Sequence, residues 1–189
     1  MLPEILIADK IGIPRDWSNL QDAACYFPRG KVVWGSDKIV KVFTGGHDKN
    51  GVTSRIEVPS ILWVTGPIFG KEFADRESIY TERKVLYGRD LFMCAYCGNQ
   101  FPEHKLTIDH VLPKSQNGKN TWVNTVTACG PCNKRKANRN PEKARMHLLY
   151  VPYVPNRFEK ILLAGKNVLA DQMDFLMTRI PKTSRQWQN

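Results

Sequence analysis

Short apolar runs separated by turn residues dominate the first third of the chain. The runs with the length and the β-branched or aromatic content of strands are residues 5–7, 32–34, 39–43 and 61–64. A polar, glycine-rich stretch at 45–51 predicts a hairpin loop, and residues 22–26 are expected to form a short helix. Mixed charges and spaced apolar residues at 72–88 predict a helix or an ordered connector. The pattern therefore predicts a small β-rich region over residues 1–88.

Apolar residues return at helical spacing near the end of the chain. They are Phe158, Ile161, Leu162, Val168, Leu169, Met173 and Leu176. This period predicts one long amphipathic helix reaching about Met177, within a C-terminal segment over residues 151–189. We expect its apolar face to pack on the core or on a second subunit, so a homodimer through this helix is one prediction.

The middle of the chain, residues 89–150, mixes both periods. Residues 105–109 predict a strand, and residues 133–139 predict a helix. A second helix is expected to begin at Pro141, because proline at the first helical position loses no hydrogen bond and Asn140 can cap it. The chain as a whole is predicted to be α+β.

Four of the five cysteines stand in two Cys-x2-Cys pairs, Cys94 with Cys97 and Cys129 with Cys132. Two such pairs match the four thiolates of a tetrahedral structural zinc site. A disulfide framework is not expected in a chain of this length without a secretion signal. Iron binding and paired redox thiols are the alternatives that the spacing leaves open. The remaining Cys25 is expected to be a small buried hydrophobic residue.

Asp109 and His110 are adjacent within the segment that the cysteine pairs enclose, and Asn133 follows the last cysteine directly. An imidazole titrates near neutral pH and can take a proton from water as a general base. Carboxylate and amide oxygens suit a Mg²⁺ or Mn²⁺ ion, which can stabilise the leaving oxygen of a phosphodiester. We therefore expect His110 as the base and Asp109 and Asn133 as metal ligands. Asn124 is expected to fix a loop through hydrogen bonds.

The formal net charge of +10 favours an anionic partner, with nucleic acid first. Between Lys105 and Arg145 there are nine basic residues and two acidic ones. The predicted contacts to a DNA backbone are Lys114, Lys134, Arg135, Lys136 and Arg139. The basic tail from Arg179 to Trp187 is expected to be disordered or to contact DNA. Since there is neither a long apolar run nor a basic-then-apolar leader, we expect no membrane partner and a cytoplasmic location.

Several motifs lie in a fixed order between Arg89 and Met146. They are Cys94-x-Tyr96-Cys97-Gly98, Leu106-Thr107-Ile108-Asp109-His110-Val111-Leu112-Pro113-Lys114-Ser115, Thr121-Trp122-x-Asn124, Cys129-x-x-Cys132-Asn133-x-x-Lys136 and Pro141-Glu142-x-Ala144. Together they resemble the HNH endonuclease family, also called His-Me finger or ββα-metal nucleases, in its bacterial or phage form. The resemblance covers about a third of the chain.

The resemblance implies a β-hairpin followed by an α-helix. It implies that His110 is the general base, that Asp109 and Asn133 bind Mg²⁺ or a similar ion, and that Asn124 orients the loop carrying the base. It further implies DNA cleavage that leaves a 5′-phosphate and a 3′-hydroxyl. The third motif position is Asn133 instead of histidine, which favours an oxygen-preferring ion over zinc at the catalytic site.

Two other functions remain open from the sequence. A zinc-stabilised module that binds nucleic acid without cleaving it is the first, although such a module has no need for Asp109, His110 and Asn133 together. A thiol redox protein that uses its cysteine pairs is the second, and tight zinc retention would count against it. The sequence favours the enzyme over both.

Overall fold

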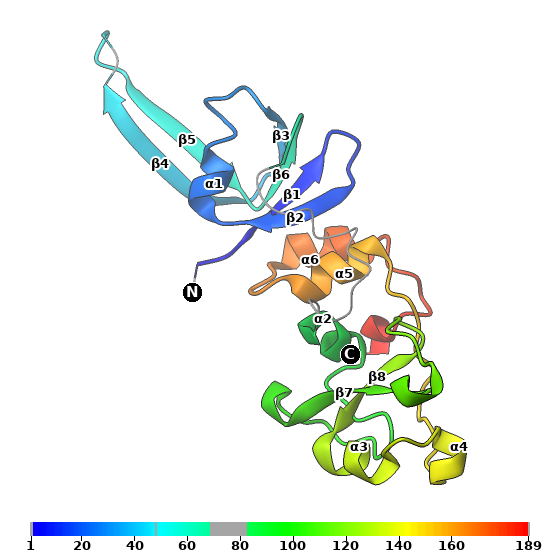
Figure 1. Ribbon diagram of the computed structural model, residues 1–189. Helices are drawn as coiled ribbons and strands as arrows, with labels where there is room; N and C mark the ends of the chain where they lie inside the picture. The colour runs from blue at the N-terminus through cyan, green and yellow to red at the C-terminus, as the bar shows by residue number, and fades with distance from the viewer. Residues whose placement is uncertain (1, 48, 69–82, 189) are drawn as a thin grey trace. The chain divides into compact units, whose positions relative to one another are not determined.

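The computed structural model describes residues 2–47, 49–68 and 83–188 (Figure 1). These residues divide into two compact units that are discontinuous in sequence. Unit 1 comprises residues 1–75 with 157–180, and unit 2 comprises residues 76–156 with 181–189. The secondary structure confirms the α+β class. Among the described residues, no helix has the length and apolar character that crossing a bilayer requires.

Unit 1 is built on a four-stranded sheet. Its strands in spatial order are β2 (Pro14–Ser18), β1 (Ile5–Asp9), β6 (Ile61–Val64) and β3 (Val32–Gly35). β1 is parallel to β6 and antiparallel to β2, and β3 is antiparallel to β6. Both faces of the central strand are covered, since residues 5–8 are fully buried. This two-sided burial explains why β1 is apolar without alternation.

The two faces of this sheet pack on different elements. Ile5 and Ile7 pack with α1 (Leu20–Ala24) and with Val58. Leu6, on the other face, packs with the C-terminal helices. Helix α1 begins two residues earlier than expected, because Asn19 Oδ1 accepts the backbone N–H of Asp22 over 2.8 Å and so caps it.

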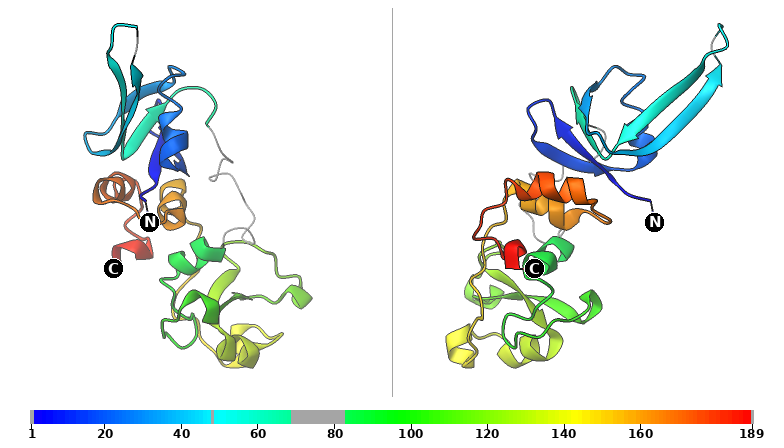
Figure 2. Two further views of the ribbon diagram at one scale, coloured as in Figure 1. Left: turned by 90° about the vertical axis from the view of Figure 1, so that its left-hand side faces the viewer. Right: turned by 180° about the vertical axis from the view of Figure 1, so that it is seen from behind.

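A second sheet in unit 1 is the hairpin of β4 (Ile39–His47) and β5 (Thr53–Pro59), which Figure 2 shows extending from the rest of the unit. β4 continues to His47, so part of the expected 45–51 loop is strand. β5 was not anticipated, because its first residues are polar and exposed and so lack the alternation that reveals a strand. Cys25 is exposed, so the expectation that it is buried was wrong. Of the connector expected at 72–88, residues up to 82 lie outside the described part.

The prediction of one long C-terminal helix was wrong. The segment forms two helices, α5 (Arg157–Ala164) and α6 (Ala170–Met177). Gly165 ends the first, where a Cβ atom would come within 2.8 Å of the Trp17 ring, and Asn167 has a φ of 101°. The helical period continues across this break because both helices pack on the same face of the sheet. A homodimer through these helices stays a prediction.

Unit 2 contains a second hairpin followed by a helix (Figure 1). Its main elements are α2 (Arg83–Arg89), β7 (Leu106–His110), β8 (Thr125–Cys129), α3 (Gly130–Lys136) and α4 (Pro141–Ala144). The strands are antiparallel and pair His110 with Thr125. The described part of the unit also contains the short 3-10 turns η2 (Glu103–Lys105), η3 (Lys114–Gln116) and η4 (Arg185–Gln188).

Two helices of unit 2 start and end for identifiable reasons. α3 begins three residues before the expected position, with proline in its first turn, and ends before Ala137, whose φ is 51°. The expected cap of α4 is confirmed, since Asn140 Oδ1 accepts the N–H of Lys143 over 2.9 Å. α4 is short because Arg145 adopts a left-handed conformation with a φ of 53°.

A buried ion pair between Arg89 and Asp90 fastens β8 in place. Arg89 Nη2 donates to the carbonyl of Thr125 over 2.8 Å, and Asp90 Oδ2 accepts the N–H of Thr127 over 2.8 Å. The strand that lies beside Asp109 and His110 is thereby tied to α2.

The C-terminal tail from Pro181 is ordered on unit 2, so the expectation of disorder was wrong, and DNA contact by the tail stays a prediction. The Arg185 guanidinium lies 3.9 Å from the centre of the Tyr150 ring, and Gln186 Nε2 donates to the carbonyl of Gly88 over 3.1 Å. Ser184 is buried as well. Residues 184–186 of the tail therefore pack on unit 2, while Lys182 and Trp187 are exposed.

Candidate active site and zinc centre

The four paired cysteines come together at one end of the unit 2 hairpin. Their sulfur atoms all lie within 4.8 Å of one another. A tetrahedron with Zn–S bonds of about 2.3 Å has edges of about 3.8 Å, so this spacing fits a zinc ion. Cys94 and Cys97 come from the turn after α2, while Cys129 ends β8 and Cys132 lies in α3. An ion here would join three segments of the unit.

The thiols make a cation favourable at this place. Burial raises the pKa of Cys129 and of Cys132, and neighbouring thiols raise that of Cys132 further. At Cys94 burial acts in the same direction, but hydrogen bonds with the backbone outweigh it and leave the pKa of this thiol below its ordinary value. Four thiolates so close together need a positive charge between them, which a zinc ion would supply.

Asp109, His110 and Asn133 line one cavity of about 280 Å³. The complete lining is Ile108, Asp109, His110, Pro113, Lys114, Asn133, Lys136, Ala137 and Asn138. The end of β7 supplies the first three residues, and α3 packs across them. The three residues expected to carry the chemistry therefore meet at one place.

Asn133 is oriented by a contact between α3 and β7. Its Nδ2 donates to Thr107 Oγ1 over 2.9 Å. Its amide oxygen accepts no hydrogen bond from the residues that the structure describes, and the residue faces the cavity. This leaves a neutral oxygen donor available for a cation.

Asp109 is almost buried, with 6% of its surface exposed, and each carboxylate oxygen has a donor. The Tyr96 hydroxyl donates to Oδ2 over 2.5 Å, and Lys136 Nζ donates to Oδ1 over 3.1 Å. Burial and then the bond to Asp109 raise the pKa of Tyr96 well above its ordinary value, so the phenol keeps the proton that it donates. Each carboxylate oxygen retains a further lone pair. Asp109 is thus held in place while it can still bind an ion.

Lys136 does not contact solvent, so the prediction that it binds a DNA backbone was wrong. Its side chain is fully buried, and its Nζ also donates to the carbonyl of His110 over 2.7 Å. Lys136 lies three residues after Asn133 and therefore on the same side of α3, toward β7. The sequence alone does not distinguish this lysine from its exposed neighbours Lys134 and Arg135.

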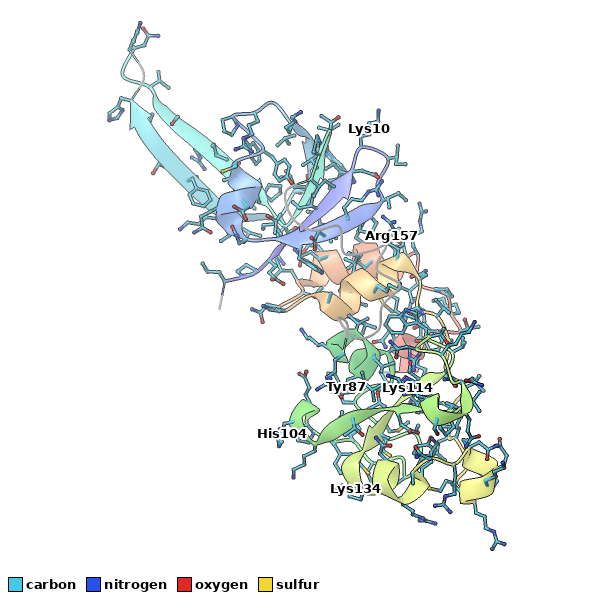
Figure 3. All side chains as sticks on the ribbon, viewed as in Figure 1. Lys10, Tyr87, His104, Lys114, Lys134 and Arg157 are labelled. Carbon is cyan, nitrogen blue, oxygen red and sulfur yellow. The ribbon has the colours of Figure 1, made fainter. Side chains whose placement is uncertain are left out.

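The other predicted DNA contacts are exposed on unit 2. Lys114 lies on the rim of the cavity, and Lys134 lies on α3 (Figure 3). Arg139 is exposed, but its guanidinium donates to the carbonyls of Arg135 and Lys136 and so caps the end of α3. Of the exposed cations, Lys114 therefore lies on the cavity rim and Lys134 and Arg135 lie on α3, while Arg139 has a partly structural position.

Asn124 lies outside the cavity and holds the loop after β7. Its Oδ1 accepts the N–H of Leu112 over 2.8 Å, and its Nδ2 donates to the carbonyls of Leu112 and Lys119 over 3.1 and 2.8 Å. These bonds are of the kind expected from the sequence, since they close a loop and leave the side chain no free donor for a substrate.

Sequence reasoning missed one partner of the His110 imidazole. His110 Nε2 lies 3.1 Å from Asn120 Oδ1. Asn120 belongs to no motif with a fixed spacing to His110, so only the folded loop reveals it. Tyr96 was likewise quoted only as part of the cysteine motif, and its bond to Asp109 depends on the approach of two segments in space.

The set of groups at the cavity suits hydrolysis of a phosphodiester. A carboxylate and an amide oxygen match the preference of Mg²⁺ or Mn²⁺ for hard oxygen ligands. The His110 imidazole lines the same cavity, and the exposed Lys114 lies on its rim. The chemistry of the donor set thus fits a divalent cation at Asp109 and Asn133.

Comparison with known proteins agrees with this geometry. No curated protein matches the chain. The segment from the first paired cysteine through α4 does match a known family, and that match includes all four paired cysteines with Asp109, His110, Asn124 and Asn133. The resemblance inferred from the motifs is thereby confirmed, and it indicates nuclease activity. Residues 94–149 match the family described as HNH endonuclease.

Proposed function

We propose that this protein is a metal-dependent DNA endonuclease that hydrolyses phosphodiester bonds with His110 as general base. The observation that carries the proposal is the cavity of about 280 Å³ that Asp109, His110 and Asn133 line together. The three side chains would have different roles in hydrolysis, and Asn133 is distant in sequence from the other two. A module that only binds nucleic acid would not need them at one cavity. We assign the hairpin β7–β8 and helix α3 to a ββα-metal core on the same ground.

Asp109 and Asn133 would hold one Mg²⁺ or Mn²⁺ ion through their side-chain oxygens. When bound, such an ion supplies positive charge to the phosphate and to the leaving oxygen. Tyr96 and Lys136 hold the Asp109 carboxylate in one orientation, which reduces the reorganisation needed for binding. The four-cysteine zinc centre keeps α3, and with it Asn133, against β7.

His110 takes a proton from the water that attacks phosphorus. A bond forms between the water oxygen and phosphorus, and the bond from phosphorus to the 3′ oxygen breaks. The leaving 3′ oxygen gains a proton from solvent and becomes a 3′-hydroxyl, while the phosphate stays on the 5′ side. The expected products are therefore ends with a 5′-phosphate and a 3′-hydroxyl.

DNA would be held through its backbone by the exposed cations beside the cavity. Lys114 is on the cavity rim, and Lys134 and Arg135 are exposed on α3. Phosphate contacts of this kind position a duplex without reading its sequence. Since each chain carries one such cavity among its described residues, cutting both strands would require two chains or two successive nicks.

The proposal is tested by incubating supercoiled plasmid with the zinc-loaded protein in buffer free of other divalent ions, then adding Mg²⁺ or Mn²⁺. We expect nicked or linear DNA only after the addition, with ends that DNA ligase can rejoin. DNA that is retained by the protein but stays intact with every divalent metal would contradict the enzyme and support a zinc-stabilised binding module.

A further inference from the structure

The His110 ring has one side-chain partner among the described residues, and that partner is Asn120. The bond of 3.1 Å joins the ring nitrogen Nε2 to the amide oxygen Oδ1. An amide oxygen can only accept, so the proton of a neutral imidazole lies on Nε2. The lone pair then lies on Nδ1, which is the nitrogen that can take a proton from water.

The backbone on both sides of Asn120 is fixed. Asn124 Nδ2 donates to the carbonyl of Lys119 over 2.8 Å, and the Asn124 N–H donates to the carbonyl of Thr121 over 3.0 Å. The Thr125 hydroxyl donates to the same Thr121 carbonyl over 2.9 Å. The side chain of Asn120 is therefore presented from an anchored turn.

His110 is anchored to the same segment. Its strand position pairs with Thr125, and the N–H of Val111 donates to the carbonyl of Asn124 over 2.9 Å. Lys136 Nζ holds the carbonyl of His110 itself. The backbones of His110 and Asn120 are thus both held by residues 124 and 125. The tertiary structure therefore sets the distance between the His110 ring and the Asn120 amide.

We infer that Asn120 is a positioning residue for the reaction: its amide oxygen selects the Nε2–H tautomer of His110 and turns Nδ1 toward the attacking water. The inference rests on the proposed role of His110 as general base. Asn120 does not line the cavity and therefore acts through the imidazole, not on the substrate. Asn124 acts one step further away, by holding the turn that carries Asn120.

Three variants separate this role from a general effect on the loop. Asn120→Ala removes the acceptor, Asn120→Asp keeps an acceptor oxygen at the same position, and Thr121→Ala changes the exposed neighbour, whose contribution to the turn is its backbone carbonyl. Cleavage of a short labelled duplex gives kcat and KM for each. We expect Asn120→Ala to lower kcat by about 10- to 100-fold with little change in KM, because a misplaced catalytic group costs that much.

We also expect Asn120→Asp to retain most of the kcat that Asn120→Ala loses, and Thr121→Ala to match the wild type. Equal kcat in Asn120→Ala and Thr121→Ala would overturn the inference, and so would an equal loss in Asn120→Asp and Asn120→Ala. Zinc content and melting temperature, measured for all three, identify any loss that is due to unfolding.

A spectroscopic measurement tests the bond independently of activity. ¹⁵N chemical shifts of the neutral His110 ring should show Nε2 protonated and Nδ1 bare in the wild type, and a mixture of tautomers in Asn120→Ala. The same mixture in the wild type would refute the bond. If the tautomer is as expected but the wild type cuts no DNA, the proposed function fails, and the positioning role of Asn120 in the reaction fails with it.

Discussion

Lys136 Nζ donates a hydrogen bond to Asp109 Oδ1 over 3.1 Å, and the two side chains are 1% and 7% exposed. The same ammonium donates to the carbonyl of His110. One buried cation therefore holds the expected metal ligand and the backbone of the expected base, and it offsets the carboxylate charge beneath the cavity. The lysine and the aspartate form a buried ion pair, so replacing either residue should leave the charge of the other buried and unpaired.

Replacing the buried lysine should be far more damaging than replacing an exposed one on the same helix. We expect Lys136→Met to lower the free energy of unfolding by about 3–5 kcal/mol, because it leaves Asp109 as an uncompensated buried charge. The matched control, Lys134→Met, should change it by less than about 0.5 kcal/mol. Urea denaturation measures both. Equal stability in the two variants would show that the pair does not support the fold.

Loss of a zinc ligand should unfold unit 2 and leave unit 1 intact. We expect Cys132→Ser to lose its zinc and to expose residues 83–156 to hydrogen exchange, since small metal-bound modules depend on the ion for folding. Cys25→Ser is the control, because that thiol is exposed and lies in unit 1. Zinc retention with unchanged protection in Cys132→Ser would argue against the four-cysteine centre.

DNA affinity should depend on salt through the exposed cations of α3. In the His110→Ala background, where cleavage does not interfere, Lys134→Ala should weaken binding about equally for unrelated duplexes. It should also reduce the slope of log K against log salt concentration by about one. Lys10→Ala removes an exposed lysine of unit 1 and should leave that slope unchanged (Figure 3). An equal effect of both changes would place the DNA elsewhere.

Removing the hydroxyl of Tyr96 should slow DNA cleavage without affecting zinc binding at the neighbouring four-cysteine centre. Tyr96→Phe deletes the donor to Asp109 Oδ2 and keeps the ring that packs on the cysteine cluster. We expect a loss of about 10-fold or more in cleavage at limiting Mg²⁺, because outer partners orient metal ligands. Zinc content should stay at the wild-type level. Unchanged dependence on Mg²⁺ would contradict a metal-binding role for Asp109.

The parts of the fold that could be predicted are those whose burial leaves a regular pattern. β1 and β6 are apolar runs because both faces are covered. β2 is mostly polar although none of its residues is exposed, and β5 begins with exposed polar residues, so neither strand shows an apolar run. The break between α5 and α6 at Gly165 could not be predicted from the spacing of apolar residues. Both helices pack on the same face of the sheet, so their apolar residues keep a helical spacing across the break.

The site divides in the same way. Asp109, His110 and Asn133 could be predicted to act together because their residue types and their places relative to the cysteine pairs mark them in the sequence, and all three line one cavity. The burial of Lys136 and the hydrogen bond from His110 Nε2 to Asn120 Oδ1 could not be predicted, because each depends on how two separate segments pack together. Residue type and spacing therefore indicated the chemistry, while tertiary contacts determine which side chains support it.

The most direct test of the central claim compares plasmid cleavage by the wild type and by His110→Ala at equal zinc content in Mg²⁺. We predict that the variant loses about 10²- to 10⁴-fold in rate, which is the usual contribution of a general base, while it still binds DNA. Cleavage by His110→Ala at the wild-type rate would contradict the account.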